Sequence, residues 1–323
     1  MITLYDAAGP CLVKRESAGD VRPETVWIDL LDPTPAEESA IESVLNIDVP
    51  TRAEMREIEA SNRFYQESGA HFMTSFVIYA KDSETALTSN VTFILSGQRL
   101  ITVRYGEPKA FPLFADKACK GELPCATGPS IMAGLLEFIV QRQADLIERV
   151  QDEIEQLAPQ IFDLKSSGRN RGKRLEVILK TIGKEGDIIS RAQESSTSLH
   201  RTLHFFADAA RERGEDPRLI SRIDVISRDI NSLTDSLRSM SGRTAFLLDA
   251  TLGMISTEQN QIIKLFSVMS VMLMPPTLVA SVYGMNFKAM PELDWPHGYT
   301  YALILMFFSG LIPYIYFRRK GWL

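Results

Sequence analysis

Residues 283–293 read YGMNFKAMPEL and separate two long stretches without Asp, Glu, Lys or Arg. The first stretch is residues 265–287, the second is residues 295–317, and each contains 23 residues. A helix of that length extends roughly 35 Å, which is enough for the hydrocarbon core of a bilayer, about 30 Å thick. The sequence therefore predicts a multi-pass protein of the lipid bilayer, with spans at about 263–284 and 297–317 and an outer loop at 285–296.

The charges beside these spans predict their orientation. The basic run Arg318–Lys320 follows the second span and Lys264 precedes the first, whereas the connecting loop carries Lys288, Glu292 and Asp294. By the positive-inside rule, we expect both termini in the cytoplasm and only the short loop outside. This topology fits the inner (plasma) membrane of a cell.

The composition predicts that the part of the chain before the spans is a water-soluble body. The 323 residues are 24% charged and carry a net charge of −6, which argues against nucleic acid as a partner. The glycines around Gly168–Lys173 have neither the spacing nor the Ser/Thr of a phosphate-binding loop, so we expect no nucleotide. His200 and His204 share a helix face without a third ligand, and no nucleophile or catalytic metal cluster is visible. We therefore do not expect an enzyme.

The first part of the body, residues 1–128, is predicted to be an α+β domain. Runs rich in β-branched and aromatic residues predict strands at 25–31, 71–79, 90–95 and 99–104, with a hairpin turn at Ser96–Gln98. Helical spacing predicts helices at 33–45 and 51–60.

The second part, residues 129–213, is predicted to be a helical hairpin. Two long amphipathic helices, at about 130–164 and 173–213, are separated by a basic, flexible segment. We expect them to pack antiparallel.

A stalk helix, residues 214–261, is predicted to continue into the first span of the membrane region, residues 262–323. Its apolar residues recur at alternating intervals of four and three, which is typical of a helix-packing seam. The seam contains Leu219, Ile223, Ile226, Ile230, Leu233, Leu237, Met240, Thr244 and Leu247. No proline occurs between Pro217 and Pro275, so one helix of about 60 residues and 90 Å can link body and membrane.

A second stripe on the same helix is mostly small, hydroxylic or amide-bearing. It contains Asp249, Gly253, Ser256, Asn260, Ile263, Ser267, Ser270, Met274, Thr277, Ser281 and Gly284. Small polar residues also let membrane helices approach closely, so helix packing is one interpretation. The other is a water-filled lumen, because the stripe continues past both ends of the span. One helix cannot enclose a lumen, so this interpretation requires several copies, each contributing the same face.

The side chains of this stripe suit a hard cation. Hydroxyl and amide oxygens serve soft metals poorly, and Mg²⁺, which gives up its water reluctantly, can pass hydrogen-bonded to neutral oxygens. Gly284 permits a bend, and Asn286 can present a ring of amide oxygens at the mouth. Pro275 and Pro276 remove backbone donors, so we expect a kink or freed carbonyl groups there.

These residues resemble the CorA magnesium transport family. The resemblance rests on Tyr283–Phe287, on Met290–Leu293 with Trp295, and on the closing run Tyr314–Leu323, and it extends into the body at Val26–Leu30. Further similarity lies at Ile58–Ser61 with Arg63 and Phe64. The Gly-Met-Asn triplet in this setting is highly specific.

The resemblance implies a funnel-shaped homopentamer that takes up Mg²⁺, with possible passage of Co²⁺ and Ni²⁺. Gly284, Met285 and Asn286 would form the selectivity motif, and Glu292 in the outer loop would help attract cations. The pore lining would include Asn260, Met274 and Thr277 beside the stripe's Ser267, Ser270 and Ser281, with Asp249 at the cytoplasmic end.

The family also implies gating by cytoplasmic Mg²⁺ bound between subunits as a regulatory ligand. Asp224 on the stalk is the candidate for that site, and the sequence identifies no partner for it. Two other functions stay open. One is a zinc-transporting member of the same superfamily, although such members tend to vary the triplet and lose the Met-Pro-Glu-Leu run. The other is a membrane-anchored coiled-coil scaffold or sensor whose spans only associate.

Overall fold

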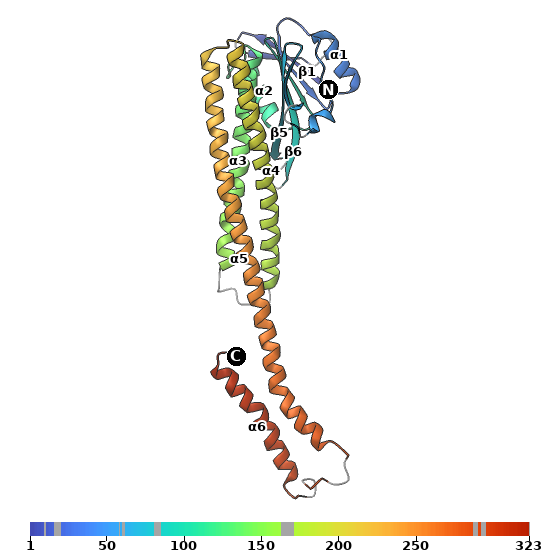
Figure 1. Cartoon of the computed structure of the whole chain (residues 1–323), viewed down its shortest axis with the longest axis vertical. Helices are drawn as coiled ribbons and strands as arrows, with labels where there is room; N and C mark the ends of the chain where they lie inside the picture. Colours follow the sequence, from blue (N-terminus) through green and yellow to red (C-terminus); the bar gives the residue numbers. More distant parts are fainter. Residues whose placement is uncertain are drawn as a thin grey trace. The chain divides into compact units, whose positions relative to one another are not determined.

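A computed structural model describes residues 1–9, 11–15, 21–57, 59, 62–80, 85–162, 171–286, 290–291 and 295–322. The chain forms two compact units. The first consists of residues 1–162 and 180–247, and the second of residues 163–179 and 248–323. Two helices, α4 (Arg171–Glu212) and α5 (Pro217–Tyr283), contribute residues to both units (Figure 1).

The first unit contains a seven-stranded mixed sheet. Its strands are β1 (Ile2–Ala8), β2 (Cys11–Arg15), β3 (Thr25–Leu31), β4 (Phe64–Glu67), β5 (Ala70–Ala80), β6 (Ala86–Ser96) and β7 (Arg99–Arg104). They lie in the order β2-β1-β3-β7-β6-β5-β4. Neighbours pair antiparallel except β3 and β7, which are parallel. Ser96 pairs with Arg99 across the β6–β7 turn, so the predicted hairpin is confirmed.

The long strands have buried side chains on both sides, because helices cover both faces of the sheet. One face packs against α1 (Pro35–Leu45), which contributes Ile41 to the core. The other face packs against α2 (Ala110–Cys119) and the long helices, around the fully buried Trp27. The Trp27 indole donates to the Thr102 hydroxyl at 3.0 Å. The expected α+β domain is thus confirmed as three layers.

The structure corrects the sequence prediction at one helix. Residues 51–60 were expected to be helical, but the described residues there form only the short 3₁₀ turn η1 (Glu54–Arg56). Thr51 and Glu54 bond each other's backbone amides, which is the signal that starts a helix. Met55 is the one buried side chain of that turn, so there is no apolar stripe to hold further turns against the core.

Three long helices lie side by side in the first unit: α3 (Gly128–Phe162), α4 and α5 (Figure 1). The two predicted amphipathic helices are confirmed as α3 and α4. The Gln143 amide of α3 donates to the Ala192 carbonyl of α4 at 2.9 Å, and Arg222 of α5 pairs with Glu137 of α3. Most of the predicted seam of α5 is also buried, from Ile223 and Ile226 to Leu247, and Leu219 and Leu233 are half-buried.

Hydroxyl groups of α4 bind the edge of strand β5. Strand β4 pairs with only the first four residues of β5, so the amides farther along need other partners. The Phe76 amide donates to the Ser198 hydroxyl at 2.8 Å, and the Ile78 amide to the Ser195 hydroxyl at 3.2 Å. These bonds attach α4 to the sheet in one register.

Candidate ion-conduction path

Two helices are long and apolar enough to cross a membrane, by length and composition. They are α5 and α6 (Gly298–Arg319), and they cover the two predicted spans except for positions 284 and 297. The apolar window of α5 has a mean hydropathy of 1.8 and that of α6 has 1.6. Helix α5 continues through Pro275 and Pro276 without interruption.

Helix α6 covers one side of α5 within the second unit. Val268 of α5 is fully buried. A side chain at Gly310 of α6 would stand 3.3 Å from the Pro276 ring and 3.5 Å from the Met272 carbonyl oxygen, so the two helices approach closely there. Toward the other end of α6, the Lys264 ammonium lies 4.9 Å from the Trp322 ring centroid. The α6-facing positions are therefore 264, 268, 272 and 276.

The polar stripe lies on the opposite side of α5. Successive residues of an α-helix are about 100° apart, which places positions 267, 270, 274, 277 and 281 roughly half a turn from the α6-facing positions. All of these side chains are exposed in the single chain, as are those of Asp249, Asn260 and Asn286. The second span therefore leaves the stripe free for solvent or for another copy of the chain.

The hydroxyls of this stripe bond to the helix backbone. Ser267 donates to the Ile263 carbonyl, Ser270 to the Phe266 carbonyl, both at 2.9 Å, and Thr277 to the Leu273 carbonyl at 2.8 Å. A hydroxyl whose proton is used in this way still has acceptor lone pairs. The stripe consequently presents oxygen acceptors, which suit the water shell of a cation.

The Gly-Met-Asn triplet follows the last residue of α5. The Gly284 amide donates to the Ala280 carbonyl at 2.9 Å and the Met285 amide to the Val282 carbonyl at 3.3 Å, which closes the helix end. A Cβ at position 284 would lie 3.1 Å from the Ala280 oxygen, so glycine suits this close approach. Asn286 follows, exposed to solvent. Glu292, predicted in the outer loop, lies outside the described residues.

Asp224, the candidate regulatory residue, lies on an exposed part of α5. Its carboxylate pairs with Arg211 of α4 at 3.5 Å, and Arg211 also pairs with Asp208 at 3.1 Å. The Nδ1 atom of His204 lies 3.2 Å from the Asp208 carboxylate, so this histidine has a carboxylate neighbour. Among the residues that the structure describes, no cluster of three or more His, Cys, Asp or Glu could hold a metal ion.

A family model described as "CorA-like Mg2+ transporter protein" matches residues 23–319 of this chain. The chain belongs to this family. CorA proteins of Escherichia coli K12 and Salmonella typhimurium LT2, both called "Magnesium transport protein CorA", are similar over nearly the whole chain. The first is 37% identical over 298 residues, which cover 92% of each chain. The second is 36% identical over 300 residues, covering 93% of this chain and 92% of the relative.

Solved structures share the CorA fold. The complete CorA magnesium transporter of Methanocaldococcus jannaschii matches 100% of this chain and 99% of its own, with a TM-score of 0.71 and 17% identity. The ZntB cytoplasmic domain of Vibrio parahaemolyticus matches 80% of this chain and 97% of its own, with a TM-score of 0.54 and 11% identity. The fold of a mixed-sheet domain, a long helix and two apolar helices is thereby confirmed. Both likenesses are of fold alone.

Proposed function

We propose that this CorA-family protein takes up Mg²⁺ through a pore formed by several copies of α5. The observation that carries the proposal is the oxygen-bearing stripe on the side of α5 that α6 leaves uncovered, ending at Gly284, Met285 and Asn286. Family membership and the magnesium transport named for the relatives support this choice of ion. The expected assembly is a homopentamer in the inner membrane with both termini in the cytoplasm.

In this mechanism the ion keeps much of its water. Hydroxyls that already donate to the helix backbone accept hydrogen bonds from the hydration shell without replacing it, and so they do not trap the ion. Asn286 supplies amide oxygens at the mouth, Asp249 supplies carboxylates at the other end of the path, and Glu292 attracts cations outside. Hydrated Co²⁺ and Ni²⁺ present the same surface, so we expect them to pass as well.

The membrane potential drives the uptake. With about 100 mV, negative inside, a divalent cation gains about 4.6 kcal/mol on crossing, at about 2.3 kcal/mol per charge. No nucleotide hydrolysis is needed, and the role is that of a transporter and not of an enzyme.

Replacement of Asn286 by alanine tests the mouth of the path. We expect Mg²⁺ influx into proteoliposomes to fall by about tenfold or more, because losing about 1.4 kcal/mol of differential interaction has that effect. The conservative Asn286→Gln, which keeps an amide, should retain more flux. Full influx in a normally expressed Asn286→Ala protein would remove Asn286 from the mechanism.

We further propose that Asp224 contributes to inhibition by cytoplasmic Mg²⁺. The present partner of its carboxylate is the Arg211 guanidinium, and both side chains are about half exposed, so a cation can compete for the carboxylate. Asp224→Lys is expected to shift the inhibition of Mg²⁺ flux to higher Mg²⁺ concentrations. Inhibition that is the same as in the wild type would exclude this role.

A further inference from the structure

Three arginines line one cavity in the first unit. The cavity has a volume of about 380 Å³ and lies beside the segment between α1 and β4. Arg52 lies just before the η1 turn, Arg56 is the last residue of that turn, and Arg63 immediately precedes β4. Guanidinium groups repel one another in a shared space, so their convergence requires an explanation.

Neutral hydrogen-bonding groups of the sheet also line this cavity. Tyr79 comes from β5, and Thr88, Ser89 and Asn90 come from β6. The Asn90 amide donates to the Met55 carbonyl, which ties the η1 turn to the sheet. Hydroxyl and guanidinium donors thus share the lining of one cavity with the apolar Met55 and Phe76.

Two of the arginines are held in place by the protein. The Arg63 Nε donates to the Glu57 carbonyl oxygen at 2.5 Å, which leaves its terminal nitrogens for another acceptor. The Arg52 guanidinium lies 5.1 Å from the Tyr105 ring centroid, and the Tyr105 hydroxyl donates to Glu38 at 3.2 Å. These contacts position the guanidinium groups without neutralising them.

Counter-charge is scarce around this cavity. Within the described part of the chain, none of the three arginines makes an ion pair, and Glu194 of α4 is the single carboxylate among the lining residues. The whole chain carries a net charge of −6, so a local excess of positive charge is unusual for it. A bound anion would balance the positive charge of the three arginines.

We propose that this cavity binds the phosphate groups of a small phosphorylated molecule. Arginine forks match phosphate oxygens in pairs, and the hydroxyls can bind the remaining oxygens. The volume lies in the range of small-molecule sites, which begins at about 300 Å³, so it can hold more than a lone phosphate. The sequence argued against a nucleotide because a phosphate-binding loop is missing, but an arginine cluster binds phosphate without one.

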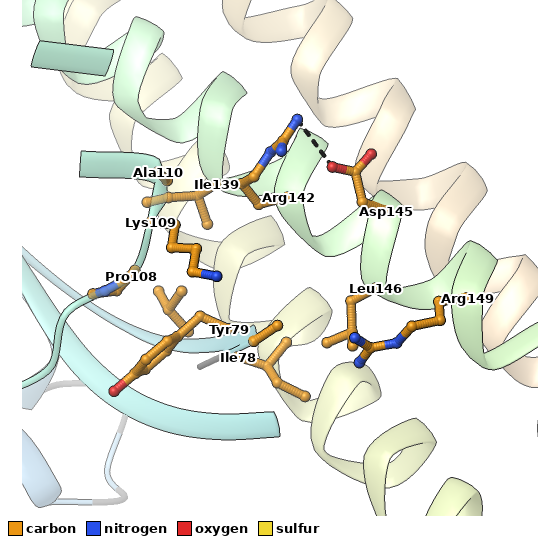
Figure 2. A pocket seen from close by; sticks show the side chains of 12 residues that line it. Ile78, Tyr79, Pro108, Lys109, Ala110, Ile139, Arg142, Asp145, Leu146 and Arg149 are labelled. Atoms are coloured by element: carbon orange, nitrogen blue, oxygen red, sulfur yellow. Dashed lines mark ion pairs between the residues drawn. The ribbon is translucent and has the colours of Figure 1, made fainter. Parts of the chain in front are cut away.

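A neighbouring cavity fits phosphate less well. It has a volume of about 280 Å³ and shares Tyr79 with the first. Figure 2 shows Arg142 paired with Asp145, at 2.9 Å, beside a surface of Ile78, Ile139 and Leu146. Lys109 and Arg149 also line this cavity, but Arg142 is paired with Asp145 and the lining is mostly apolar, without the Thr88, Ser89 and Asn90 of the first cavity. We therefore assign the site to the cavity of Arg52, Arg56 and Arg63.

Calorimetric titration of the full chain in detergent, without Mg²⁺, tests the assignment with ATP, pyrophosphate and inorganic phosphate. We expect ATP and pyrophosphate to bind more tightly than phosphate. Arg56→Gln should weaken their binding by about tenfold, and Glu194→Gln should strengthen it because it removes a charge that repels the ligand. Arg201→Gln, an exposed change elsewhere on α4, is the matched control and should bind like the wild type.

The outcomes separate the possible ligands. Tighter binding of ATP than of pyrophosphate supports a nucleotide-like ligand, and equal binding supports a polyphosphate group alone. If inorganic phosphate binds as tightly as ATP and pyrophosphate, the proposal of a ligand larger than phosphate is wrong. Binding unaffected by Arg56→Gln and by Arg52→Gln, or no binding by any of the three anions, would overturn the site itself.

Discussion

Glu185 of α4 is buried without a hydrogen-bond partner among the described residues. Its side chain is 1% exposed, and neither carboxylate oxygen accepts a hydrogen bond. The Lys184 ammonium stands 4.0 Å away, and Glu153 of α3 is a second nearby carboxylate. Burial, and next the neighbouring Glu153, raise the pKa of Glu185 to about 7.

This carboxyl group should make the stability of the protein depend on pH. Because its pKa is higher in the folded than in the unfolded chain, the folded state binds an extra proton between the two values. The free energy of unfolding should therefore fall by about 3 kcal/mol as the pH rises from about 4.5 to about 7, and stay low above that. Glu185→Gln should remove this fall and be more stable than the wild type at about pH 8.

Unfolding of both proteins, followed by circular dichroism across this pH range, measures the effect. Glu148→Gln, an exposed change on α3, should keep the wild-type dependence. An unchanged pH dependence in Glu185→Gln would contradict the explanation.

Spacing predicts some functional residues but not others. The polar stripe was predicted because its side chains recur at alternating intervals of four and three, and the structure places them on one face of α5. The same rhythm places Glu185 between Ile182 and Ile189 in the buried face of α4, so this signal was present and was missed. The arginine cavity has no such signal, because its lining comes from separate segments of the chain, among them the η1 turn, strands β5 and β6, and α4.

At the scale of elements, strong periodicity predicted the strands β3, β5, β6 and β7 and the helices α1, α3, α4 and α5. Strands β1, β2 and β4 were missed, and so was α2, although its buried positions Ala110, Phe111, Phe114 and Ala118 follow a helical repeat. Short or edge elements show too few repeats of a pattern to stand out. Residues 51–60 show the reverse error, since helix-forming residues do not suffice where only one side chain is buried.

The start of α3 depends on a glycine. The Gly128 amide donates to the Gln98 carbonyl at 2.7 Å, and a Cβ at this position would lie 2.5 Å from the backbone of Arg99 and Leu100. Gly128→Ala should therefore destabilise the protein by about 1–3 kcal/mol, the usual cost of overpacking, because β7 would have to move. Chemical denaturation followed by circular dichroism measures the change.

Gly183 in α4 is the matched control. A Cβ there would meet no atom within 4 Å, so Gly183→Ala should stabilise the helix by up to about 1 kcal/mol. Equal effects of the two substitutions would contradict the packing argument at Gly128.

At the scale of the whole molecule, a single chain shows which face of α5 is polar but not which other copies of the chain surround that face. The polar stripe is exposed in the single chain, and a repeat pattern cannot give the number of copies that enclose it. The pentamer was implied by the family resemblance and stays a prediction. The same limit applies to Asp224, whose proposed ligand would lie between subunits.

Cysteine labelling distinguishes a pore from a scaffold. With Cys11, Cys119 and Cys125 replaced, Ser270→Cys should react with a charged, water-soluble thiol reagent and lose Mg²⁺ flux, because the stripe would face water. Ile312→Cys on α6, an apolar position 64% exposed in the single chain, should face lipid and stay unreactive. Cross-linked dimers without flux would instead support the scaffold.

The serines that bind the edge of β5 limit how the first unit can move. Sliding α4 along the sheet would break the bonds of Ser195 and Ser198 and the contact of 2.6 Å between Thr202 and Ser75. Each buried group left without a partner costs about 1–3 kcal/mol. The sheet and α4 should therefore move together as one rigid body, and any bending of α4 is expected outside the stretch from Ser195 to Thr202 that contacts β5.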